Sequence, residues 1–135
     1  MIMRGQTMSG LKVLFCIVPL WVASATLAHG QEATERFVPI GQSPGESGKT
    51  TTLGNVQSVN AQARSMSVVA AGGGVVSIAW AERTLIWIDR SAQQLSVLNG
   101  TAADLQPGRR VEFRPEKANP GLAKWIKVEA GSAAK

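Results

Sequence analysis

Residues 66–80, which read MSVVAAGGGVVSIAW, decide the fold because they carry the pattern of a β-hairpin. On each side of three consecutive glycines, every second residue is apolar. These apolar residues are Met66, Val68 and Ala70 before the glycines, and Val76, Ile78 and Trp80 after them. The alternation predicts two antiparallel strands that each bury one face, with the glycines as the tight connection.

The rest of the C-terminal region predicts further short strands, over residues 53–59, 84–88, 95–98, 111–113 and 122–128. Residues 84–88 are β-branched and apolar on both faces, so we expect them to form the most buried strand. Thr101 and Asp104 have the spacing of a capping box, and Pro107-Gly108 ends the one short helix. The pattern predicts a mostly β domain, a small antiparallel barrel of about five to six strands.

Several motifs in this region also resemble a known family. They are Gly54-x-Val56-x-x-Val59, Thr84-x-Ile86, Ala103-Asp-Leu-Gln-Pro-Gly-Arg-Arg-Val111 and Ala123-x-x-Ile126-x-Val128. In this order they resemble the exported bacterial domains of unknown function grouped as DUF5666. The resemblance covers residues 52–129 and implies an OB-like small barrel. It implies no catalytic or binding residues.

The N-terminus has the layout of a secretory signal peptide. Arg4 and Lys12 precede an uncharged run, VLFCIVPLWVASATLA, from Val13 to Ala28. This run has sixteen residues, fewer than the roughly 20 that span a bilayer as a helix, and Pro19 interrupts it. We predict cleavage after Ala28 and export to the periplasm. The alternative is a retained anchor that holds the domain at the membrane, outside the cytoplasm.

The predicted organisation is therefore a signal peptide (1–28), a flexible arm (29–51), the barrel (52–130) and a short tail (131–135). After cleavage, 12 Lys and Arg would face 9 acids, since Arg4 and Lys12 leave from the total of 14. The net charge falls from +5 to +3. Because Cys16 also leaves, the exported fold must be stabilised by burial without a disulfide.

The predicted arm contains SPGESGKT at residues 43–50, which is similar to the end of a phosphate-binding loop. Serine occupies position 43, where that motif needs its first glycine, and the β-prone residues 51–56 follow where it needs a helix. We therefore interpret the segment as a solvated, turn-rich arm rather than a nucleotide site.

The side chains of the predicted barrel argue against enzymatic catalysis and against a metal. It has no cysteine and no histidine, and its carboxylates are scattered as on any small β-domain. CusF-like periplasmic barrels hold Cu(I) with two methionines and one histidine, capped by a tryptophan. Here the barrel offers only Met66, and His29 lies in the arm. We expect Met66 and Trp80 to be core residues, and no cofactor.

Basic and aromatic residues gather near the C-terminus and form the candidate interaction face. Its residues are Trp87, Arg109, Arg110, Phe113, Arg114, Lys124, Trp125 and Lys127. Tryptophan and arginine are enriched at binding hot spots, so this face favours a non-enzymatic accessory or structural module that docks on an envelope protein. The alternative is a soluble periplasmic binding domain for a small or polyanionic ligand, such as an acidic glycan or a lipid headgroup.

The predicted export argues against nucleic acid as the ligand of this face. The simpler reading is that Phe113 belongs to the core and the charges are solvated.

Overall fold

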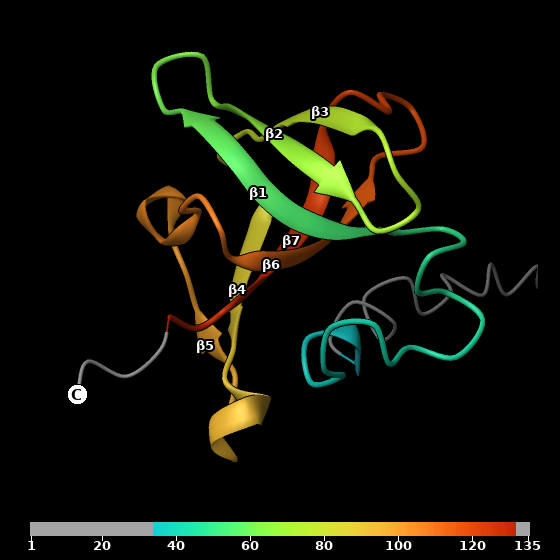
Figure 1. Cartoon of the computed structure of the whole chain (residues 1–135), viewed down its shortest axis with the longest axis vertical. Helices are drawn as coiled ribbons and strands as arrows, with labels where there is room; N and C mark the ends of the chain where they lie inside the picture. The colour runs from blue at the N-terminus through green and yellow to red at the C-terminus, as the bar shows by residue number, and fades with distance from the viewer. Residues whose placement is uncertain (1–33, 132–135) are drawn as a thin grey trace, which may run out of the picture.

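The computed structural model describes residues 34–131, which form a mostly β fold as predicted (Figure 1). Its strands are β1 (Thr52–Asn60), β2 (Ser65–Ala70), β3 (Val75–Ala79), β4 (Leu85–Asp89), β5 (Leu98–Asn99), β6 (Arg110–Pro115) and β7 (Ala123–Glu129). The described chain thus has seven strands, and two 3-10 turns, η1 (Ser91–Gln93) and η2 (Ala102–Asp104), stand in place of the one helix. The predicted signal peptide, His29 and residues 132–135 lie outside the described residues.

The predicted hairpin is confirmed, because β2 and β3 pair antiparallel across the three glycines. Met66 pairs with Ile78 and Val68 with Val76, as the alternation requires. The predicted capping box is also present at η2, where the Thr101 amide donates to Asp104 Oδ2 at 2.8 Å.

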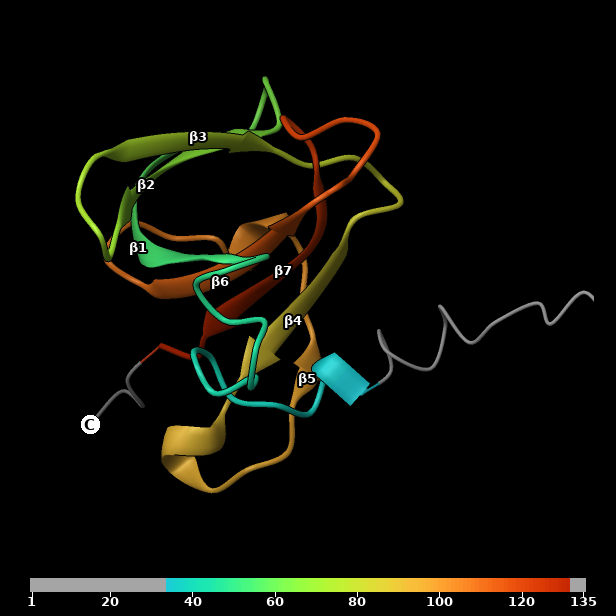
Figure 2. The same cartoon turned by 90° about the vertical axis from the view of Figure 1, so that its right-hand side faces the viewer.

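The strands follow the order β3-β2-β1-β6-β7-β4-β5 in a single sheet. All neighbours pair antiparallel except β4 and β7, which are parallel, so the expectation of a wholly antiparallel barrel is wrong. The sheet curls until the end of β3 meets the residues just before β7 (Figure 2). There Ala79 forms a parallel bridge with Leu122, and its amide donates to Gly121 O at 2.9 Å.

The main hydrophobic core lies inside this curl. It contains Val56, Met66, Val68, Ile78, Trp80, Leu105, Val111, Phe113, Ala123, Ile126 and Val128. Met66 and Trp80 are therefore core residues, as predicted. The most buried strand is β7 rather than β4, because β4 lies beside the two-residue β5 and leaves Leu85 41% exposed.

Gly54 marks the place where β1 passes from β2 to β6. It pairs with Ala70 on one side and Val111 on the other. A Cβ at this position would lie 2.2 Å from Val69 O and 2.7 Å from Val68 Cγ1. Only glycine therefore allows the two strands to approach this closely.

Residues 34–51 differ from the flexible arm that we expected. They fold back in a series of turns over the outer face of β6, β7 and β4, and we call them the strap. Ile40, Ser43 and Thr51 of the strap are buried. The strap adds a second layer outside the curled sheet. Within the described residues, no helix is long and apolar enough to cross a membrane.

Candidate docking surface

The aromatic residues of the predicted interaction face are all buried. Phe113 is 1% exposed and belongs to the main core, as the simpler reading of the sequence held. Trp87 and Trp125 lie on the outer face of β4 and β7, with ring centroids 5.5 Å apart and planes tilted by 31°. Beneath the strap their exposures are 4% and 0%. The structure therefore corrects the expectation of an exposed tryptophan face.

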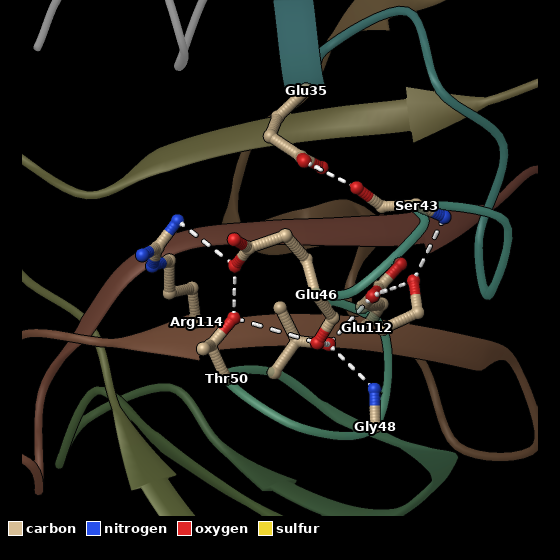
Figure 3. Close-up of polar contacts among 9 residues, drawn as sticks. Glu35, Ser43, Glu46, Gly48, Thr50, Glu112 and Arg114 are labelled. Carbon is tan, nitrogen blue, oxygen red and sulfur yellow. Dashed lines mark hydrogen bonds and ion pairs between the residues drawn. The ribbon is translucent and has the colours of Figure 1, made fainter.

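The strap is held on that face by the carboxylate of Glu112, which projects outward from β6 (Figure 3). Glu112 Oε1 accepts the Gly41 amide at 3.0 Å. Its Oε2 accepts the hydroxyls of Ser47 and Thr51, both at 2.7 Å. Ser47, inside the segment that is similar to a phosphate-binding loop, thus donates to an anion of its own chain, as do Gly41 and Thr51 on either side of that segment. The Ser47 hydroxyl therefore has a partner within the chain.

Lys127 is the cation of this layer and is 1% exposed. Its ammonium donates to the carbonyl of Val38 in the strap and lies 5.2 Å from the centre of the Trp125 ring. Burial lowers the pKa of Lys127, while the nearby Glu112, Glu35 and Asp89 act in the opposite direction. Lys127 therefore serves the attachment of the strap and is not available to an outside anion.

Asp89 holds the middle of the strap from the end of β4. Its Oδ2 accepts the Ile40 amide at 2.9 Å, and its Oδ1 accepts the Ser91 amide at 2.8 Å. Burial by itself would raise the pKa of Asp89, but these hydrogen bonds and the charge of Lys127 outweigh it and lower the pKa. The carboxylate is thus kept ionised by its structural contacts.

The four remaining cations of the predicted face have different surroundings and do not share a common contact. Arg109 donates to the carbonyl of Asp104 at 3.2 Å, and Arg114 lies 3.7 Å from the Glu46 carboxylate of the strap. Lys124 is half-buried near Glu116. Arg110 is exposed. The structure therefore does not assemble the eight predicted residues into one surface.

Arg110 does share an exposed row with residues that the sequence analysis missed. It pairs with Asn55 of β1, which pairs with Val69 of β2, which pairs with Val75 of β3. All four side chains are exposed, Val69 at 43% and Val75 at 59%. The row thus runs across four strands of the sheet, from Arg110 on β6 to Val75 on β3.

The outer edge of β3 is open. Within the described chain, β3 pairs with β2 alone apart from the single bridge at Ala79. The Ala79 amide points away from β2, toward Gly121. Backbone groups alternate along an antiparallel strand, so the N–H and C=O groups of Ser77 and Val75 also point outward.

This open edge lacks the protection that natural edge strands carry. Such strands are usually shortened, bulged, or marked by charged residues or proline. The β2–β3 register has no bulge, and every residue from 65 to 80 is uncharged and none is proline. The opposite edge, β5, has only two residues. The uncharged stretch was the sequence signal that could have identified the β3 edge.

The carboxylates of the described chain are largely engaged in structural contacts. Glu116 forms a bidentate pair with Arg83, at 2.7 and 2.9 Å, while Asp104 caps η2. Among residues 34–131, no group of three or more His, Cys, Asp or Glu side chains is arranged to hold a metal ion.

Comparison with known proteins yields little. No family model matches the chain, and no curated protein matches it. Among solved structures it is similar to the crystal structure of Ag(I)CusF, with 14% sequence identity and a TM-score of 0.40. The match covers 58% of this chain and 93% of that one. A similarity at this level carries no argument about function or ligand.

Proposed function

We propose that this protein is an exported, non-enzymatic module that acts by protein–protein contact at the open edge of β3. In this role it is an accessory or structural component of an envelope assembly. The observation that carries the proposal is the uncharged, valine-rich strand with one unpaired edge. An edge of this kind is a template for another β-strand, and a protein that leaves it bare is prone to aggregate.

Three further observations support the proposal. The strand path, in which β3 and β4 return to pair with β2 and β7, supports an OB-like barrel. Glu112, Asp89 and Glu116 are committed to contacts within the chain, which supports a non-catalytic role. Export rests on the signal-peptide pattern of residues 1–28.

The chemistry of the edge favours a polypeptide over a membrane as its partner. The outward N–H and C=O groups of Val75 and Ser77 need hydrogen-bond partners when they are covered. An acyl chain offers none, whereas a β-strand offers a matching row. The adjoining exposed side chains of Val69 and Val75 supply apolar contact area.

The test is site-specific photo-crosslinking in the cells that make the protein. A photoreactive residue replaces Val75 in one variant and Lys117 in the control, since Lys117 is exposed in the turn before β7. We expect a discrete protein adduct from position 75 and none from position 117. In a further variant the photoreactive residue replaces Val69, which pairs with Val75. Adding Val75→Lys to this variant should prevent its adduct, because a lysine on an edge strand opposes the addition of another strand. Equal labelling at 75 and 117, or no adduct at 75, contradicts the proposal.

A further inference from the structure

We infer that the strand which fills the β3 edge is β3 of a second copy of this chain. The two strands run antiparallel about a two-fold axis that passes beside Val76. This inference rests on the proposed function, because it names the partner of the same edge. A two-fold arrangement is the common form of homodimer, in which one surface patch meets itself.

The backbone of β3 selects the position of the axis. The backbone N–H and C=O groups of Val75, Ser77 and Ala79 point away from β2, at the open edge of the sheet. The Ala79 amide is already bonded to Gly121, so Val75 and Ser77 are the residues left to pair with another strand. An axis at Val76 places Val75 opposite Ser77 of the other copy, and Ser77 opposite its Val75. Each of these two pairs exchanges both of its hydrogen bonds. An axis at Ser77 would require Ala79, and one at Val75 would require Gly73 in the turn.

The absence of charge argues for self-pairing in particular. A two-fold axis brings every side chain near it close to its own copy, so a charged residue there would repel itself. The chain as a whole carries 14 Lys and Arg against 9 acidic residues, yet residues 65–80 carry neither kind. An edge built for an acidic or basic partner would carry the opposite charge, and this one carries none.

The geometry also limits the strength of the dimer. One short strand pair and a few valines cover much less than the roughly 800 Å² per partner of a standard stable interface. We therefore expect a reversible dimer whose population rises with concentration.

Disulfide trapping tests the register. In the full chain with Cys16→Ser, the introduced cysteine is the sole thiol. In the inferred dimer Val76 faces Val76 of the other copy as a non-hydrogen-bonded pair, with Cα atoms about 4.5 Å apart, within the range of a disulfide. The matched control is Ser77→Cys. In the inferred register the Cα atoms of the two Ser77 residues lie about 8 Å apart, because they are separated by about 6.8 Å along the strands and about 4.8 Å between them. That separation is too great for a disulfide.

The expected result is a disulfide-linked dimer from Val76→Cys after mild oxidation, and at least a tenfold lower yield from Ser77→Cys. The protein without introduced cysteines should show a mass in sedimentation equilibrium that rises toward twice the monomer with concentration. Equal crosslinking at the two positions, or a monomer at every concentration, overturns the inference. Circular dichroism of each variant confirms that the fold is retained.

The outcomes separate this inference from the proposed function. An adduct from position 75 to a different protein, together with a monomeric mass, retains the proposed function and refutes the second copy. Concentration-independent protection of the Val75 and Ser77 amides from hydrogen exchange means that another part of the chain covers the edge, and it also refutes the second copy. No adduct and a monomeric mass refute both.

Discussion

Replacing Glu112 tests how much of the attachment of the strap depends on this one buried carboxylate. This side chain accepts hydrogen bonds from Gly41, Ser47 and Thr51 in the C-terminal part of the strap, and it is 0% exposed. Glu112→Ala removes all three acceptor contacts. Glu112→Gln keeps the shape, because its amide oxygen can accept from Gly41 while its NH₂ group donates to the two hydroxyl oxygens.

The expected losses follow from the number of contacts. A hydrogen bond to a charged group contributes about 1.5–3 kcal/mol, so three would suggest more than about 4.5 kcal/mol. Removing one member of a buried charged cluster generally costs about 3–5 kcal/mol, and Lys127 would remain buried without this neighbour. We expect Glu112→Ala to lower the free energy of unfolding by about 4 kcal/mol. For Glu112→Gln we expect about 1.5 kcal/mol, the charge-dependent part alone.

The assay is urea unfolding followed by circular dichroism, together with tryptophan fluorescence. Because the strap covers Trp87 and Trp125, its release should shift their emission to longer wavelength in the alanine variant. Glu82→Gln is the matched control, since Glu82 is exposed. It should change the free energy of unfolding by less than about 0.5 kcal/mol.

The reasoning is refuted if Glu112→Ala unfolds at the same urea concentration as Glu82→Gln. Equal losses in the alanine and glutamine variants would refute the role of the individual hydrogen bonds and assign the whole effect to charge. An unchanged emission spectrum in a destabilised alanine variant would show that the strap stays in place without Glu112.

Three further predictions concern the same layer and the curl beneath it. The pKa of Asp89 is lowered in the folded state, so its contribution is present above the ordinary value of 3.8 and is lost as pH falls through the folded value. Asp89→Asn should therefore reduce the loss of stability seen below about pH 4 in acid titrations. Lys127→Met should destabilise the fold by about 3 kcal/mol in urea, because the nearby buried carboxylates lose their cation; a neutral or stabilising effect would contradict this. Gly54→Ala should lower the melting temperature by the equivalent of about 1–3 kcal/mol, since its Cβ meets Val69 O, whereas Gly72→Ala, with open space around it, should not.

Short-range patterns in the sequence were sufficient for most of the strands, whereas the strand predicted over residues 95–98 is reduced to Leu98–Asn99. The alternation around Gly72–Gly74 predicted the β2–β3 hairpin, and the Thr101–Asp104 spacing predicted the capping box. Both features depend on residues close in the chain, so periodicity and local hydrogen bonding specify them. The same reasoning placed Met66 and Trp80 in the core.

The tertiary structure alone decided what the polar and aromatic residues do. Trp125 reads as an exposed hot spot in sequence, and Glu112 as a surface charge, because both alternate outward from strands of a small barrel. They are buried because a segment 61 to 89 positions earlier in the chain folds over them. Such pairing depends on long-range complementarity, here of a carboxylate with the donors of a turn, which no local period encodes. The open edge of β3 likewise became visible only once the strand order showed which strand has no second neighbour.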